Sequence, residues 1–194
     1  MSSPFQEVPV LPVVIPLGVL IFALLLLHLR GRGLFSVPRV AVAAAVAVYA
    51  AGITANTVFP IFLNKPERPG SWEPGLALIP FVDYELYDAV MNMAVFLPLG
   101  MLVPLMLRGP VWWKVLVGIG ASSLTIELTQ LAAQAFLAGG HIADINDFLF
   151  NVLGGATGYG LFRLMVRIPV LSAIINRFRW SKPSHDEPAL RTLA

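Results

Sequence analysis

Five apolar stretches, each long enough to cross a lipid bilayer as a helix, constrain what this sequence can fold into. A helix crossing the hydrocarbon core of a bilayer needs about 20 mostly apolar residues, and few other structures satisfy the backbone there. The stretches run approximately over Val10–Leu29, Pro38–Phe59, Leu86–Leu107, Val111–Ala135 and Ile145–Val166. The sequence therefore predicts an all-α, polytopic membrane protein with about five transmembrane helices.

Composition supports the same class, because polar side chains are too scarce to cover a water-soluble protein of this length. Of the 194 residues, 57% are hydrophobic and only 12% are charged, whereas soluble domains carry about 25% charged residues. Cysteine is absent, which excludes disulfides, thiolate nucleophiles and cysteine-based metal sites. No lysine or arginine precedes Arg30, so we expect no cleavable signal peptide.

Positive charges orient the predicted bundle, since cytoplasmic loops of membrane proteins carry an excess of lysine and arginine. Of the thirteen such residues, only Lys65 and Arg68 fall on one side of the five spans. Those on the other side are Arg30, Arg32, Arg39, Arg108, Lys114, Arg163, Arg167, Arg177, Arg179, Lys182 and Arg191. We therefore expect the N-terminus outside and the C-terminus in the cytoplasm.

Three regions follow from this topology. Residues 1–74 hold two spans and an outer loop, residues 75–167 hold the other three spans, and residues 168–194 form a cytoplasmic amphipathic segment and a polar tail. Five prolines between positions 60 and 85 exclude a regular helix from that part of the outer side.

Polar side chains recur at helical spacing in the last three stretches, so those of each stretch share one face. They form the predicted pocket, which consists of Asp88, Asn92, Ser123, Glu127, Gln130, His141, Asp144, Asp147 and Asn151. A rise of about 1.5 Å per residue places them in the outer half of the membrane. Because an acid at the bilayer centre costs roughly 2.5–3.5 kcal/mol, we expect these residues to have a function in an outward-facing polar pocket.

Packing and capping offer structural alternatives for most of these residues. Asp144 and Asp147 can cap the helix that begins beside them, and Asp88 can do the same in the third stretch. The hydroxyl and amide side chains can form hydrogen bonds between helices. Glu127 has neither explanation, because it lies at no end of its helix and near no fixed cation, so a functional role is the better interpretation.

Small residues indicate where helices approach closely. Gly154 and Gly158 form a GxxxG pair, which is typical of helix packing. Ala43, Ala47 and Ala51 give the second stretch a small-xxx-small face, which can pack within the chain or against another copy.

The chemistry of the predicted pocket is less constrained than its position. Glu127, His141, Asp144 and Asp147 could supply ligands to a divalent cation, but their spacing is not diagnostic and we predict neither a metal nor a cofactor. If the pocket is catalytic, Glu127 and Asp147 are the candidate acid and base. The sequence contains no HExxH, GxSxG or P-loop motif.

Four motifs, taken together, resemble a known family. They are GLALIPF (75–81), DAVMNMAVFLPLGMLVP (88–104), SLTIELTQ (123–130) and HIADINDFLFNVLGGATGYG (141–160). Their IPF element and their N-x3-F-x-PLG, S-x3-E-x2-Q and D-x2-D-x3-N-x2-G-x3-G patterns resemble the VanZ-like family in order and spacing. The resemblance covers about residues 75–165. His141 stands where the family usually carries an arginine, which exchanges a permanent charge for a pH-dependent one.

The resemblance implies a role in glycopeptide resistance at the bacterial cytoplasmic membrane, specifically in tolerance of the lipoglycopeptide teicoplanin. The partners it implies are membrane lipids and either a lipoglycopeptide or a lipid-linked wall precursor, with no nucleic acid. A membrane-embedded enzyme acting on a lipid-linked envelope substrate is an alternative. A small permease is less favoured, because the five spans show no internal repeat. The sequence leaves the oligomeric state open.

Overall fold

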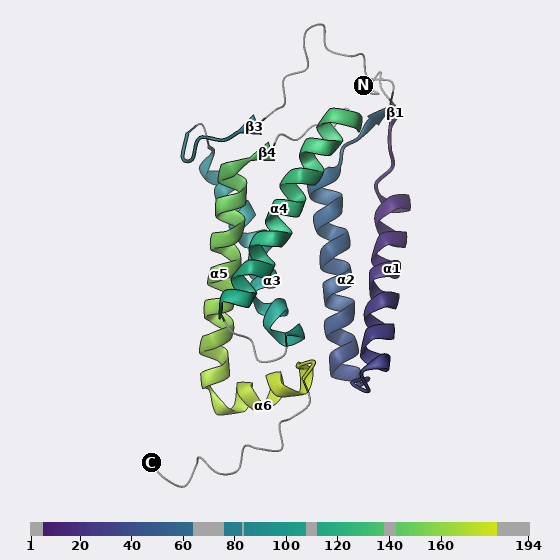
Figure 1. The fold of residues 1–194 in the computed structure, drawn as a ribbon, viewed down its shortest axis with the longest axis vertical. Helices are drawn as coiled ribbons and strands as arrows, with labels where there is room; N and C mark the ends of the chain where they lie inside the picture. Colours follow the sequence, from purple (N-terminus) through teal and green to yellow (C-terminus); the bar gives the residue numbers. More distant parts are fainter. Residues whose placement is uncertain (1–5, 64–75, 83, 108–111, 138–142, 182–194) are drawn as a thin grey trace, which may run out of the picture.

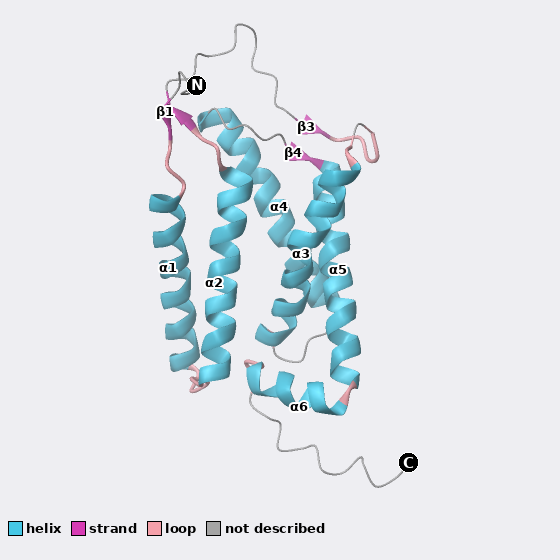
Figure 2. Ribbon diagram, turned by 180° about the vertical axis from the view of Figure 1, so that it is seen from behind, coloured by secondary structure: helices cyan, strands magenta, loops and turns pink. Residues whose placement is uncertain are grey.

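The computed structural model describes residues 6–63, 76–82, 84–107, 112–137 and 143–181, and it shows a bundle of long helices (Figure 1). The helices of this part are α1 (Leu11–Gly31), α2 (Val37–Val58), α3 (Leu86–Met106), α4 (Trp112–Leu137), α5 (Ile145–Arg167) and α6 (Pro169–Phe178). The strands are β1 (Gln6–Glu7), β2 (Phe62–Leu63), β3 (Leu76–Ala77) and β4 (Ala143–Asp144). All four strands lie at the end of the bundle opposite α6 (Figure 2).

Helices α1 to α4 are each long and apolar enough to cross a membrane, and α5 with α6 forms the fifth candidate span. Helix α5 has 23 residues, which at 1.5 Å per residue gives it a length of roughly 35 Å. Helix α6 turns away from it by 116°. The predicted all-α polytopic membrane fold is confirmed, and each long helix begins and ends within two residues of its predicted limits.

Proline both starts helices and interrupts them. It lies in the first turn of α1, α2 and α6, where its missing N–H costs no hydrogen bond. Pro98 lies inside α3, where it removes an intrahelical donor. The Tyr49 hydroxyl of α2 donates a hydrogen bond to the Val95 carbonyl, 3.0 Å away, in the turn of α3 before Pro98. A neighbouring helix thus supplies a partner beside the interruption.

The closest helix contact joins α3 to α5, which are neighbours in space but not in sequence. Gly100 of α3 and Gly154 and Gly158 of α5 lie where the two backbones nearly touch. A Cβ atom built on Gly158 would lie 2.9 Å from the Leu97 carbonyl carbon, and one on Gly154 would lie 2.5 Å from Met93 Cα. Only glycine fits these positions without moving a backbone.

The small residues of α2 face α1 of the same chain. A Cβ atom on Gly18 of α1 would lie 3.3 Å from Ala51 Cβ and 3.7 Å from the Ala47 carbonyl oxygen. Ala43 is buried in a cluster that includes Leu29 of α1. Of the two alternatives for this face, packing within the chain is therefore the one observed.

The segment after α6 fastens the α1–α2 hairpin to the rest of the bundle. Trp180 is buried between the hairpin and α3, and its backbone N–H donates to the Leu105 carbonyl at 2.8 Å. The Arg39 guanidinium of α2 donates to the carbonyls of Arg179 at 2.8 Å, Ser181 at 3.2 Å and Leu34 at 3.2 Å. We call residues 179–181 the C-terminal strap. The sequence indicated an amphipathic helix here but did not indicate the strap.

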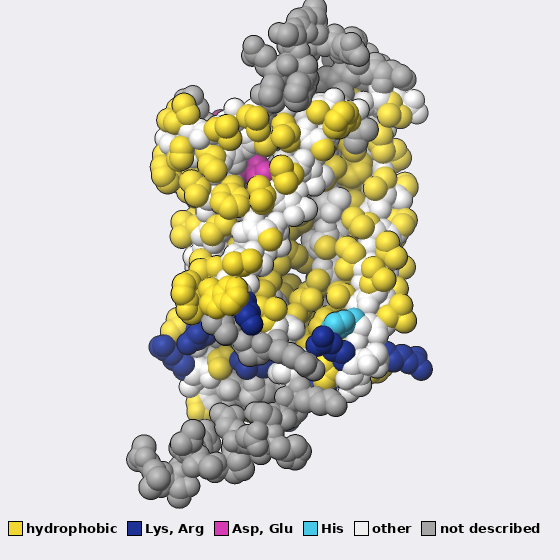
Figure 3. All heavy atoms as spheres, in the orientation of Figure 1, with side chains coloured by type: hydrophobic (Ala, Val, Ile, Leu, Met, Phe, Trp, Pro, Cys, Tyr) yellow, Lys and Arg dark blue, Asp and Glu magenta, His cyan; other side chains and the backbone are white. Residues whose placement is uncertain are grey.

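Figure 3 shows the described Lys and Arg side chains gathered at the end of the bundle where α6 lies. This end carries the α1–α2 turn and both ends of α6 (Figure 1). The distribution agrees with the predicted topology, in which this end faces the cytoplasm.

The absence of cysteine makes this topology directly testable by single-cysteine labelling. Glu7→Cys in β1 and Gly31→Cys at the end of α1 are both exposed positions, and Gly31 has open space for a side chain. In intact cells, a membrane-impermeant maleimide is expected to label Glu7→Cys at once and Gly31→Cys only after permeabilisation. Labelling in the reverse order would show that the orientation is inverted.

Candidate functional site

The candidate site surrounds the first turn of α5, at the end of the bundle opposite α6. Asp144 is the N-cap residue of α5, and its carboxylate accepts the Asn146 backbone N–H at 2.8 Å. Asp147 lies in the first helical turn. Both acids therefore sit at the N-terminal end of the helix, where the helix dipole is positive.

Hydrogen bonds link this turn of α5 to α3 and α4. The Asn92 amide of α3 donates to the Asp147 carboxylate. The Asp144 backbone N–H donates to Glu127 Oε2 of α4 at 2.9 Å. One turn deeper in the bundle, the Asn151 amide donates to the Ser123 hydroxyl at 3.1 Å. Six of the nine predicted pocket residues thus contact one another in pairs.

The position of Glu127 differs from what its place in α4 suggested. Its side chain is 7% exposed, and its carboxylate lies at the start of α5, where it accepts a backbone N–H that has no partner inside that helix. The sequence interpretation that Glu127 lies at no end of its own helix agrees with α4, but its side chain meets the start of a different helix. The spacing of residues along α4 does not reveal which helix terminus the side chain meets.

The three remaining residues of the predicted pocket, Gln130, Asp88 and His141, are not among these hydrogen-bonded pairs of the described structure. Gln130 is 7% exposed, and its side-chain oxygen is buried without a hydrogen-bond partner. Asp88 is exposed on α3. His141 lies outside the described residues, so its predicted place in the site stays a prediction. Within the part of the chain that is described, no three His, Cys, Asp or Glu side chains group closely enough to hold a metal ion.

Asn146 is a site residue that the sequence reasoning missed. Its side chain is 1% exposed, its Oδ1 accepts the Phe81 backbone N–H at 2.6 Å, and its Nδ2 donates to the Val82 carbonyl at 3.3 Å. Phe81 adopts a left-handed backbone conformation (φ 62°), which is unusual for a bulky residue. An amide two residues after the N-cap Asp144 was the available signal.

Asn146 acts together with a short parallel strand pair. Strand β3 pairs with β4 so that Leu76 lies opposite Ala143 and Ala77 opposite Asp144. The pair and the Asn146 hydrogen bonds hold residues 78–82, which we call the outer-edge loop, against the start of α5. The IPF element therefore belongs to the same site as the acids of α5.

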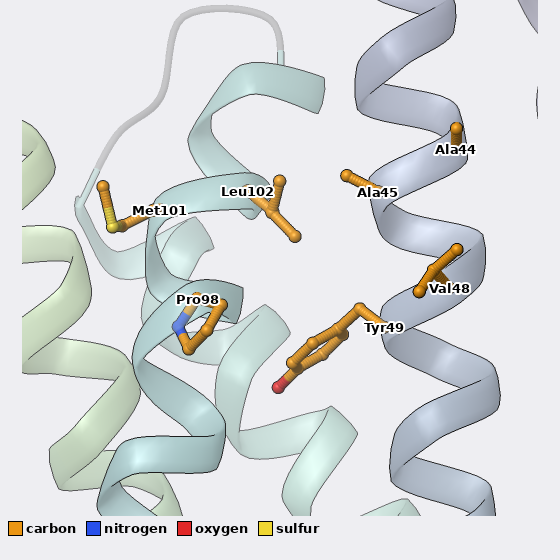
Figure 4. A pocket seen from close by; sticks show the side chains of 7 residues that line it. All are labelled: Ala44, Ala45, Val48, Tyr49, Pro98, Met101 and Leu102. Atoms are coloured by element: carbon orange, nitrogen blue, oxygen red, sulfur yellow. The ribbon is translucent and has the colours of Figure 1, made fainter.

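An apolar groove lies between α2 and α3, away from the start of α5 (Figure 4). It has a volume of about 610 Å³ and is lined by Ala44, Ala45, Val48, Tyr49, Pro98, Met101 and Leu102. Its lining is apolar, and none of the predicted pocket residues contributes to it. The groove is thus distinct from the polar residues at the start of α5, whose pocket stays a prediction.

Comparison with known proteins gives one match. The model of the VanZ/LLP1 family matches residues 45–166, a span from α2 to the end of α5 that contains every polar residue of the candidate site. No curated protein and no solved structure matches the chain. The family match covers more than half of the sequence and agrees with the motifs in α3, α4 and α5. The chain belongs to the VanZ/LLP1 family.

Proposed function

We propose that this VanZ-type membrane protein contributes to tolerance of lipoglycopeptides of the teicoplanin type at the bacterial cytoplasmic membrane. In this proposal, the residues around the first turn of α5 bind the drug or its lipid-linked target at the outer leaflet. The family match supports the membrane class, and the polar residues at one end of an apolar bundle support a binding role.

Glu127 is the observation that carries the proposal. A carboxylate that is only 7% exposed in an apolar bundle is costly, and one hydrogen bond from Asp144 offsets only part of that cost. A neutral glutamine would accept the same backbone N–H with nearly the same shape. A purely structural role therefore does not require the acid, whereas recognition of a positively charged or donor-rich ligand does.

Susceptibility measurements test this proposal. A sensitive host would express the wild type, Glu127→Gln or Asp147→Asn at matched membrane levels. We expect the wild type to protect against teicoplanin more than against vancomycin, and both variants to be as susceptible as cells with an empty vector. Thr125→Ala, at an exposed α4 position whose hydroxyl bonds within its own helix, is the control that retains protection.

Other outcomes would contradict the binding role. Equal teicoplanin susceptibility in all strains would reject a function in tolerance. The site would instead be catalytic if the wild type converted a lipid-linked wall precursor and the Glu127→Gln variant bound this precursor without converting it.

A further inference from the structure

Gln130 continues a row of polar residues along α4. Ser123, Glu127 and Gln130 are spaced by four and three residues, so they lie on one face of the helix. The first two reach α5, since Ser123 accepts from Asn151 and Glu127 accepts from the Asp144 backbone. Helix α4 also contacts β4, which directly precedes α5. The row therefore directs Gln130 toward the N-terminal end of α5.

The side-chain oxygen of Gln130 is the unusual member of this row. It is buried without a hydrogen-bond partner, and the side chain as a whole is 7% exposed. Buried carbonyl groups are nearly always paired, because leaving one unpaired costs free energy. An apolar residue of similar size would avoid this cost, so the unpaired oxygen points to a partner supplied by a ligand.

The acids of the candidate site define the chemistry of that ligand. Glu127, one turn before Gln130 on α4, reaches the start of α5, where Asp144 and Asp147 lie, and these carboxylates accept hydrogen bonds and carry negative charge when ionised. A ligand that suits them brings N–H donors and positive charge. A compact ammonium group provides three donors, and it does not need the convergent ligand geometry of a metal ion, which the described acids lack.

The outer-edge loop adds an apolar surface beside these acceptors. Ala77 pairs with Asp144 across β3 and β4, and the residues that follow Ala77 carry large exposed side chains. Leu78 and Ile79 are each 67% exposed, and Phe81 is 64% exposed. An alkyl chain attached to the ammonium group would find apolar contacts along this loop.

We propose that Gln130 Oε1 and the Glu127 carboxylate bind the ammonium group of an amphiphile, whose alkyl chain lies along the outer-edge loop. This inference rests on the proposed function, because it names the chemical class recognised at the same site. The shared chemistry is a primary alkylammonium, whether it belongs to a lipid headgroup or to a separate molecule.

A matched pair of probes tests the N–H donors separately from the charge. The full chain would be purified in nanodiscs of phosphatidylcholine and titrated with octylammonium or octyltrimethylammonium, which share the chain and the charge but differ in N–H groups. We expect octylammonium to raise the Tm of the wild type, because a ligand that binds the folded state stabilises it, and the trimethyl compound to leave it unchanged. An equal effect of both compounds, or of neither, would overturn the proposal.

Gln130→Met separates a binding role from a structural one. Without ligand, we expect its Tm to equal or exceed that of the wild type, because the substitution removes an unpaired buried acceptor. We also expect it to lose the rise in Tm caused by octylammonium. Gln134→Met, at a glutamine of the same helix that already has an interaction, is the control that keeps this rise. A lower Tm for unliganded Gln130→Met, or loss of the rise in both variants, would reject the role of Gln130.

Two further measurements identify the source of the ammonium group and separate this inference from the tolerance role. If nanodiscs of phosphatidylethanolamine raise the wild-type Tm and abolish the octylammonium effect, the ligand is a lipid headgroup; if they do neither, it is a separate amine. Tolerance that depends on Glu127 in a protein that does not bind octylammonium would overturn this inference alone. Binding of octylammonium without any tolerance phenotype would instead overturn the proposed function alone.

Discussion

Gly158→Ala is expected to lower the stability of the folded protein by about 1–3 kcal/mol or more, the usual cost of overpacking a tight contact. The added Cβ atom would lie 2.9 Å from the Leu97 carbonyl carbon and 3.1 Å from Leu97 Cα. These are backbone atoms of α3, which cannot rotate away as a flexible side chain can. Helices α3 and α5 must therefore separate, and the Asn92–Asp147 hydrogen bond that depends on their spacing is strained.

Gly160→Ala, two residues further along α5, is the matched control for this prediction. A Cβ atom there meets nothing within 4 Å, and alanine favours a helix over glycine by up to about 1 kcal/mol. The two variants are thus expected to shift the Tm in opposite directions when thermal unfolding is followed in the same detergent. A similar shift for both would show that the α3–α5 contact is looser than described.

Arg39→Ala is expected to release the C-terminal strap and to destabilise the protein by about 2–3 kcal/mol, since hydrogen bonds to a charged donor are stronger than neutral ones. The half-buried guanidinium holds the carbonyls of Arg179 and Ser181 at 2.8 Å and 3.2 Å. Without it, these carbonyls lose their donor, and Trp180 is retained only by its packing and its backbone bond to Leu105.

The rate at which maleimide reacts with Ser181→Cys in the purified protein measures this release. The rate should rise when Arg39→Ala is added to the same chain and stay constant with Arg30→Ala, an exposed arginine at the same end of the bundle. Arg39→Lys should give only partial recovery, because an ammonium cannot reproduce the fork of guanidinium donors that reaches three carbonyls. An unchanged rate in Arg39→Ala would mean that packing of Trp180 alone holds the strap.

The helices were predictable because each depends on a local property, the length of an apolar run, that the sequence states directly. Which helices contact one another was harder to predict from the sequence. That α3 lies against α5 is implied only by Gly100, Gly154 and Gly158, and nothing in the individual motifs says which glycine meets which backbone. The acids and amides of the site were recognised by type and depth, but the pairs they form depend on this arrangement.

Two features escaped prediction because they depend on contacts between distant segments. Asn146 acts on Phe81 and Val82, 65 and 64 residues earlier in the chain, and the pairing of β3 with β4 brings these segments together. The strap depends on Arg39, which is 140 residues before Arg179. In the sequence Arg39 contributes to the count of positive charges, and that count gives no hint of a specific partner.

The strap also has a consequence for the order in which the protein is made. Ribosomal synthesis delivers the α1–α2 hairpin to the membrane first, but the residues that fasten it, Arg179 to Ser181, emerge only after all the spans have been translated. Until then the hairpin can only associate with the later helices through their direct contacts. Completion of the fold is therefore coupled to completion of the segment after the last helix, and a nascent chain that ends at Phe178 carries every candidate span yet leaves its first two unfastened.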